Sequence, residues 1–144
     1  MTAFAHLPEL QTLLLKQNGA ILHITLNRPE MRNAMSELML REMSQVFDVI
    51  ENDLTVRAVI LRGAEGHFCA GGDIKDMGGL RAESMSAGNH DGYVRFNRAF
   101  GTLIDKVNHA PQVVVAVLEG AVLGGGFGLA CVSDVALARD TAQF

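Results

Sequence analysis

The sequence predicts a single α/β domain, and three observations along its 144 residues support this. Short apolar runs of strand length recur, two longer segments carry apolar residues at helical spacing, and the two kinds of segment alternate. Strands that alternate with helices are typical of α/β folds with a parallel sheet. Hydrophobic residues make up 49% and charged residues 19%, which favours a packed globular domain over a disordered chain.

A β-hairpin is expected first. Residues 13–17 and 20–27 both alternate between apolar and polar side chains, and Asn18-Gly19 between them is a strong hairpin signal. The second run would place three large side chains on one face: Leu22, Ile24 and Leu26. Pro29 then prevents the strand from continuing.

Two helices with apolar stripes are expected next. The first begins after Ser36, which is a favourable N-cap residue, and ends near Asn52-Asp53. Its stripe consists of Met39, Met43, Val46, Phe47 and Ile50. The second helix ends near residues 108–111. Its stripe consists of Phe96, Phe100, Leu103, Ile104 and Val107.

Three further strands and two irregular segments complete the prediction. Residues 56–62 and 135–138 are expected to be strands, and 113–118 is a continuous β-branched run, typical of a strand covered on both faces. Residues 67–79 are expected to form a glycine-rich loop. Residues 81–92, which are polar and rich in small side chains, are expected to be a mobile loop or a frayed helix.

Two glycine-rich turns, FCAGGD and GGGFG, each follow a predicted strand. Glycine permits close approach of a ligand to the peptide N–H groups, and at a helix start these groups lack intrahelical partners. Two such amides that converge on one oxygen would form an oxyanion hole. Either turn alone also fits simple close packing of the backbone. The residues themselves do not show whether the turns face each other.

Several other functions are disfavoured. Leu129 stands where a dinucleotide-binding GxGxxG motif needs its last glycine, and no GK[ST] sequence indicates a phosphate-binding loop. A net charge of −4 without a basic run argues against a nucleic-acid partner, and no apolar run is long enough for a membrane span. Cys69 and Cys131 form no CxxC motif, so we expect no metal site and a reduced, cytoplasmic localisation.

Three segments resemble, in order, the signature blocks of the enoyl-CoA hydratase/isomerase, or crotonase, superfamily. They are NRPEMRNAMS (27–36), GHFCAGGDIKDM (66–77) and APQVVVAVLEGAVLGGGFGLACVSDVALA (110–138). The resemblance implies a ClpP/crotonase-like spiral of ββα turns, with residues 1–144 as the N-terminal part of an acyl-CoA-binding domain. That part would be C-terminally incomplete, lacking the last turn and the C-terminal helices. It also implies a homotrimer or a dimer of trimers at full length.

The resemblance also implies roles for individual residues. Gly72 and Gly125 match the two catalytic amides that bind a thioester enolate. The residues that match the substrate and coenzyme A site are Met31, Arg32, Ala70, Gly72, Asp73, Ile74, Lys75 and Gly125. Arg32 and Lys75 fit equally well as solvated surface charges, and Asp73 as a helix N-cap or loop anchor. No separate cofactor is expected, because coenzyme A is part of the substrate.

One departure from the family pattern concerns proton transfer. Family hydratases commonly use two glutamates, and the first position, three residues after Gly125, is here Gly128. The second would fall beyond Phe144. Asp134 and Glu119 are possible substitutes, although structural roles suit both better. The sequence therefore predicts an enoyl-CoA hydratase or isomerase, with a branched glutaconyl-type thioester as one substrate class. The alternatives are another crotonase-type reaction (isomerase, decarboxylase or thioester hydrolase) and a non-catalytic acyl-CoA-binding fragment.

Overall fold

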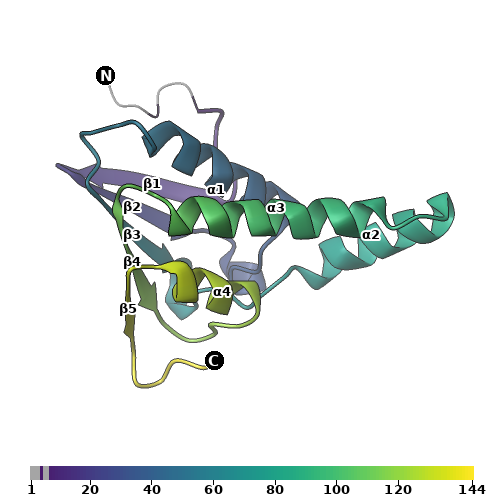
Figure 1. Cartoon of the computed structure of the whole chain (residues 1–144). Helices are drawn as coiled ribbons and strands as arrows, with labels where there is room; N and C mark the ends of the chain where they lie inside the picture. Colours follow the sequence, from purple (N-terminus) through teal and green to yellow (C-terminus); the bar gives the residue numbers. More distant parts are fainter. Residues whose placement is uncertain (1–3, 5–6) are drawn as a thin grey trace.

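The computed structural model describes residue 4 and residues 7–144 (Figure 1). The chain forms a mixed α/β structure in which strands and helices alternate after an initial hairpin. The strands are β1 (Leu13–Asn18), β2 (Ile21–Leu26), β3 (Ala58–Gly63), β4 (Val113–Leu118) and β5 (Val135–Ala138). The helices are α1 (Glu37–Ile50), α2 (Ile74–Ala87), α3 (Asp91–Asn108) and α4 (Gly125–Val132), with short 3₁₀ turns at Pro29–Met31 and Ala64–Gly66.

The strands form one sheet in the order β1-β2-β3-β4-β5. β1 and β2 are antiparallel, which confirms the predicted hairpin, and all later neighbours are parallel. Val59 of β3 lies between Leu22 of β2 and Val114 of β4, so three buried side chains form a row across the sheet. Each parallel pair is joined by at least one helix, as parallel strands require.

The helices cover one face of this sheet. Alternate strand residues on that face, including Leu22, Ile24 and Leu26, are fully buried against side chains of α1 and α3. On the opposite face Val113 is 51% exposed and Leu137 is 58% exposed. The prediction that 113–118 is covered on both faces is therefore wrong for this structure. Strand order advances in one direction from β2 to β5, so right-handed crossovers place every connecting helix on the same side.

The first helix is held by two polar side chains. Ser36 caps α1 as predicted, because its hydroxyl accepts a hydrogen bond from the Met39 amide at 3.1 Å. Glu42 lies on the buried side of α1 and accepts hydrogen bonds from the amides of Gln11 (2.8 Å) and Thr12 (2.9 Å). This carboxylate thereby ties the segment before β1 to the helix, a contact that the apolar pattern of α1 does not indicate.

Three predicted boundaries need correction. The glycine-rich loop ends at Asp73 rather than Gly79, because α2 begins at Ile74. Residues 81–92 are not a mobile loop, since α2 continues to Ala87 and α3 begins at Asp91. The helix was hard to recognise because only Leu80 and Ser84 of α2 are buried, which leaves no apolar stripe. The strand predicted at 56–62 is β3, which starts two residues later.

A turn at Gly88, which has a positive φ of 68°, joins α2 to α3. In Figure 1 the two helices form a hairpin that extends away from the sheet. None of the helices in the described part of the chain combines the length and apolar character that a membrane crossing requires.

Candidate functional site

The two glycine-rich turns lie side by side. The segment at Cys69 pairs with the segment at Val122 in a parallel bridge, and the Leu123 amide donates to the Cys69 carbonyl oxygen at 2.9 Å. A Cβ atom built on Gly124 would lie 3.5 Å from Gly71 Cα. The structure thus brings together two turns that are about fifty residues apart in sequence.

Gly72 and Gly125 line one cavity of about 180 Å³. The side chains that complete its lining are Met35, Met77, Phe96, Asn97 and Phe100. Among these side chains only Asn97 is polar, so the cavity is an apolar space bordered by two backbone segments. The sequence indicated Phe96 and Phe100 only as core residues, because the apolar pattern of a cavity wall is the same as that of a packed core.

Neither glycine amide has a hydrogen-bond acceptor within the described part of the chain. Gly72 forms a parallel bridge with Met35, but the bonds of this bridge use the Gly71 carbonyl (2.7 Å) and the Asp73 amide (2.8 Å). Gly125 is the first residue of α4, where no preceding helical carbonyl is available, and the helix dipole adds partial positive charge there. Both amides are therefore free to bind an anionic or carbonyl oxygen.

Close packing explains how α4 reaches this position. A Cβ atom on Gly126 would lie 2.6 Å from the Cys69 carbonyl oxygen and 2.7 Å from Cys69 Cβ. Only glycine at this position lets the first turn of α4 approach the Cys69 segment so closely. The N-cap residue Gly124 also has a positive φ of 50°, which glycine adopts without strain.

Comparisons with known proteins match this arrangement to one family. The sequence model described as enoyl-CoA hydratase/isomerase matches residues 16–144. The chain belongs to the enoyl-CoA hydratase/isomerase family. The chain is 36% identical over 134 residues to a probable enoyl-CoA hydratase of Rhizobium meliloti. The matched region covers 93% of this chain and 48% of that relative. It is also 36% identical over 141 residues to the short-chain-enoyl-CoA hydratase of Clostridium acetobutylicum, with coverages of 94% and 49%.

Solved structures of family members confirm the predicted crotonase-like α/β fold. Pseudomonas aeruginosa AtuE superposes with a TM-score of 0.84 at 56% identity, covering 90% of this chain and 48% of that one. An enoyl-CoA hydratase/isomerase from Marinobacter aquaeolei superposes with a TM-score of 0.84 at 54% identity, with coverages of 91% and 50%. The chain spans about half the length of the relatives that it matches.

Other residues predicted for the family's ligand site lie around the turns rather than in the cavity lining. Met31 is half-buried and Arg32 is exposed, and the Arg32 carbonyl accepts a hydrogen bond from the Ala70 amide at 3.0 Å. At the start of α2, Ile74 is 83% exposed and the Lys75 side chain is also exposed. Their roles toward coenzyme A stay predictions.

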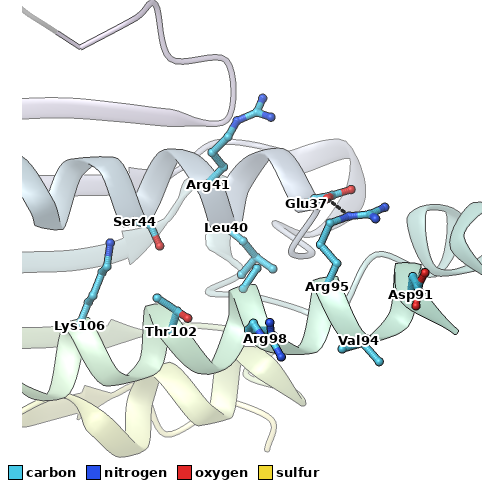
Figure 2. Close-up of a pocket in the computed structure, with 11 residues that line it drawn as sticks. Glu37, Leu40, Arg41, Ser44, Asp91, Val94, Arg95, Arg98, Thr102 and Lys106 are labelled. Carbon is cyan, nitrogen blue, oxygen red and sulfur yellow. Dashed lines mark hydrogen bonds and ion pairs between the residues drawn. The ribbon is translucent and has the colours of Figure 1, made fainter.

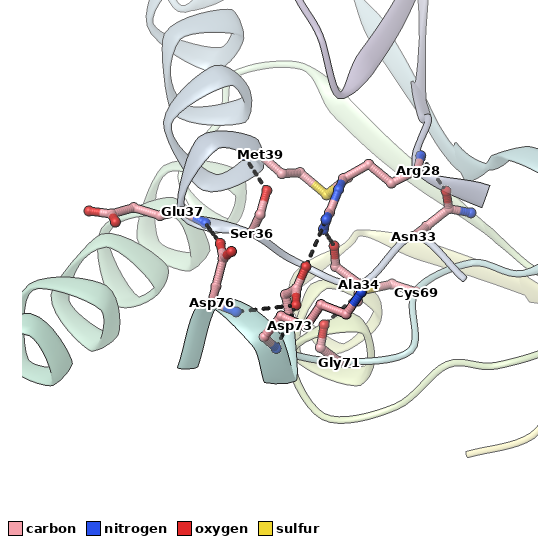
Figure 3. Close-up of polar contacts among 11 residues, drawn as sticks. Arg28, Asn33, Ala34, Ser36, Glu37, Met39, Cys69, Gly71, Asp73 and Asp76 are labelled. Atoms are coloured by element: carbon pink, nitrogen blue, oxygen red, sulfur yellow. Dashed lines mark hydrogen bonds and ion pairs between the residues drawn. The ribbon is translucent and has the colours of Figure 1, made fainter. Parts of the chain in front are cut away.

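Asp73, in contrast to Arg32, Ile74 and Lys75, is buried. Its side chain is only 2% exposed and forms an ion pair of 2.7 Å with Arg28, as Figure 3 shows. The same carboxylate accepts hydrogen bonds from the amides of Lys75 (2.9 Å) and Asp76 (3.3 Å) at the start of α2. The Asp73 side chain is therefore the N-cap of α2, the structural role that its sequence position allowed.

We expect Asp73 to make stability depend on acidity. Burial acts to raise the pKa of Asp73, but hydrogen bonds from Arg28 and the α2 amides outweigh burial and lower the pKa from its ordinary 3.8. The folded state therefore favours the carboxylate, and this stabilisation is complete above the ordinary pKa and is lost as pH falls through the lower, folded pKa. Urea unfolding should show Asp73→Asn less stable than wild type at pH 7. The difference in the free energy of unfolding between wild type and variant should narrow below about pH 4. A difference that stays constant with pH would contradict the lowered pKa of Asp73.

The candidate proton-transfer residues lie elsewhere. Asp134 accepts a hydrogen bond from the Val114 amide at 2.7 Å, and Glu119 pairs with Arg139 at 2.8 Å. Neither carboxylate belongs to the cavity lining. A Cβ atom on Gly128 would lie 3.2 Å from Phe100 Cζ, so this position adjoins a wall residue but has no side chain to transfer a proton.

A larger cavity of about 650 Å³ lies between α1 and α3 and shares no lining residue with the glycine turns (Figure 2). Two of its four basic side chains form ion pairs, Arg95 with Glu37 at 3.2 Å and Lys106 with Asp48 at 2.6 Å, and neither glycine-rich turn reaches it. We therefore do not regard it as the site of this family's chemistry.

The two cysteines should differ sharply in reactivity. Cys69 is fully buried, and burial raises the pKa of its thiol to about 11, whereas Cys131 is exposed. Because the thiolate is the reactive form, alkylation of the native protein by iodoacetamide near neutral pH should modify Cys131 only. Mass spectrometry should then find a second modified thiol after unfolding in urea. Rapid labelling of Cys69 in the native state would contradict this burial.

Proposed function

We propose that this protein is an enoyl-CoA hydratase/isomerase-type enzyme, a lyase or isomerase, that binds an acyl-CoA thioester and stabilises its enolate with the amides of Gly72 and Gly125. One observation supports the proposal above all: the two glycines line the same small cavity, and neither amide has an acceptor in the described part of the chain. Residues 1–144 would then form an acyl-CoA-binding domain, with coenzyme A as part of the substrate and no further cofactor.

The chemistry follows from the thioester group. Removal of a proton next to the carbonyl, or addition of water across a 2,3-double bond, places negative charge on the thioester oxygen. Fixed N–H donors stabilise this charge more than they stabilise the neutral carbonyl, which is the condition for catalysis. The apolar walls formed by Met35, Phe96 and Phe100 suit an acyl chain.

The substrate class is a finer proposal. We propose a branched glutaconyl-type thioester, whose second carboxyl group could accept a hydrogen bond from the Asn97 amide at the cavity wall. Gly128 favours a second candidate within the family, because a glycine cannot act as a general acid or base. This candidate is another crotonase-type reaction, namely isomerisation, decarboxylation or thioester hydrolysis. A non-catalytic acyl-CoA-binding protein is the remaining alternative.

Binding and turnover assays distinguish these candidates. Calorimetric titrations with crotonyl-CoA, 3-methylglutaconyl-CoA and free coenzyme A would measure the contribution of the acyl group. The same thioesters would then be assayed for hydration, isomerisation, decarboxylation and release of free coenzyme A, and the last three products would support another crotonase-type reaction. Turnover with a preference for 3-methylglutaconyl-CoA supports the full proposal. Binding of both thioesters without any product supports the non-catalytic alternative, and failure of both to bind more tightly than free coenzyme A overturns the site.

The assembly and location of the protein are also proposals. We expect the full-length protein to be a homotrimer or a dimer of trimers, as the family resemblance implies. From its charge, composition and cysteine usage we also propose a cytoplasmic location without nucleic-acid or membrane partners. Sedimentation velocity on the full-length protein would test the trimer directly, and a monomer at micromolar concentration would contradict it.

A further inference from the structure

We propose that Arg28 is a positioning residue: through its ion pair with Asp73, it fixes the peptide that presents the Gly72 amide to the cavity. The inference rests on the proposed function, because it assigns the ion pair a role in enolate stabilisation. Arg28 is itself outside the cavity lining, so any effect on catalysis has to pass through the segments that it holds, namely the backbone at residues 71–73 and the Ala34–Met35 segment.

The peptide unit between Gly71 and Gly72 must be held in one orientation, because its N–H group is the Gly72 amide. Its carbonyl oxygen accepts a hydrogen bond from the Met35 amide at 2.7 Å. In a trans peptide the N–H points opposite to the C=O, so this bond directs the Gly72 amide away from Met35's backbone. Gly71 has a φ of 98°, a conformation with few steric restraints for glycine, so the orientation depends on contacts made by its neighbours.

Asp73 supplies the restraint on the other side of Gly72. Its amide donates to the Met35 carbonyl oxygen at 2.8 Å, and its buried carboxylate binds Arg28. The two oxygens of this carboxylate have separate tasks. Oδ1 accepts hydrogen bonds from the backbone amides of Lys75 and Asp76 in α2, whereas Oδ2 accepts one from the Arg28 guanidinium at 2.7 Å. Capping of α2 therefore does not require Arg28, and the ion pair needs an explanation of its own.

Arg28 is held as firmly as the carboxylate that it binds. Its second guanidinium nitrogen donates to the Ala34 carbonyl oxygen at 2.6 Å, and its amide donates to the Asn33 side chain at 2.8 Å. Asn33 is fully buried and donates to the His67 carbonyl oxygen at 2.7 Å. Figure 3 shows the guanidinium between Asp73 and Ala34. Arg28 thus connects the segment before α1, which carries Met35, to the residue that follows Gly72.

The test measures enolate stabilisation separately from binding. Acetoacetyl-CoA forms an enolate with its own ultraviolet absorbance, so the enolate fraction of the bound ligand at saturation reports the oxyanion amides without requiring a general acid or base. The variants are Arg28→Gln and Arg28→Lys. The control is Arg139→Gln, which removes an exposed arginine from a 2.8 Å ion pair with Glu119, remote from the cavity lining.

We expect Arg28→Gln to bind acetoacetyl-CoA with an unchanged or slightly raised Kd but to lower its enolisation constant by about 10-fold to 100-fold, since a misplacement of about 1 Å can have an effect of that size. Arg28→Lys should recover part of the loss, because lysine keeps the charge but not the two-nitrogen geometry. Arg139→Gln should equal wild type.

The remaining outcomes overturn either the role of Arg28 or the proposed function. A folded Arg28→Gln variant that enolises the ligand as wild type does would overturn the inference. If Arg28→Gln does not fold, Asp73→Asn decides the question, because it keeps a capping oxygen and removes the ion pair; normal enolisation in that variant would likewise overturn it. If wild-type protein binds acetoacetyl-CoA without raising the enolate fraction of the ligand, the proposed function itself is refuted. If wild type raises the enolate fraction and only the variants differ in it, the proposed function stands.

Discussion

Replacement of Gly63 by alanine is expected to destabilise the protein more than any other single methyl addition considered above. Gly63 has an ordinary extended conformation, with φ −103° and ψ 151°, so the restriction is one of space alone. A Cβ atom there would lie 1.8 Å from the His67 carbonyl oxygen and 2.6 Å from the Phe68 carbonyl oxygen. Both obstacles are backbone atoms, so no change of side-chain rotamer can relieve the overlap.

Relief of this overlap would require the turn after β3 to open. Asn33 donates hydrogen bonds to the carbonyl oxygens of Ala64 (3.0 Å) and His67 (2.7 Å), and both bonds would be strained or lost. We expect a loss of at least about 3 kcal/mol in the free energy of unfolding, which is the upper end of overpacking effects. The turn continues directly into the Cys69 segment, so the Gly72 amide should also be displaced.

Urea denaturation followed by circular dichroism would measure this loss. Gly101→Ala is the matched control, because Gly101 is exposed within α3 and a Cβ atom there meets nothing within 4 Å. Alanine at this position should raise stability by about 0.5–1 kcal/mol, since it lowers the conformational entropy of the unfolded chain. Equal stability of Gly63→Ala and wild type would show that the turn is not closed as described.

The second large effect is expected from Gly125→Pro, which removes one proposed oxyanion donor and keeps the helix. Proline is well tolerated at the first position of a helix, where the N–H has no intrahelical partner. Removal of one such donor typically lowers the rate roughly 10²–10³-fold. We expect a loss of that order in the enolisation constant of bound acetoacetyl-CoA, or in turnover if the chain is active.

Gly125→Ala separates the effect of the lost N–H from that of the added Cβ atom. Both substitutions place a Cβ atom about 3 Å from Met35 Sδ and Phe100 Cε2, which are the ends of adaptable side chains. Only proline also removes the N–H. Alanine should therefore retain most of the enolate signal that proline abolishes, with comparable circular dichroism spectra and thermal unfolding for the two variants. Similar enolisation in both would exclude the Gly125 amide as a donor.

Gly72→Ala is expected to lower enolisation less than Gly125→Pro, because alanine keeps the peptide N–H. Apart from its chain neighbours, the one heavy atom of the described residues within 4 Å of its added Cβ is Met77 Sδ at 3.1 Å, near the end of a flexible side chain. The backbone can therefore stay in place and the amide survives. Enolisation of bound acetoacetyl-CoA close to the wild-type level in Gly72→Ala would show that the peptide N–H, rather than the absence of a side chain, matters at this position.

Features that depend on short-range chemistry can be predicted from the residues alone. Gly19 favours the hairpin because it adopts the positive φ of 58° in the turn, which lies at Gly19-Ala20, one residue later than predicted. Ser36 caps α1, and periodic apolar residues define the buried side of α3. The three signature blocks also identified the family and drew attention to Gly72 and Gly125. In each case the information lies within a few neighbouring residues, so it can be recognised without knowing the fold.

Which of these features come together in space depends on the packing of the whole fold. The placement of Gly72 and Gly125 on one cavity, the one-sided cover of the sheet and the Arg28–Asp73 ion pair all result from the order and handedness of the strand crossovers. Arg28 and Asp73 are 45 residues apart, and neither helical nor strand periodicity relates them. Long-range contacts of this kind depend on how whole elements pack, which local patterns do not encode.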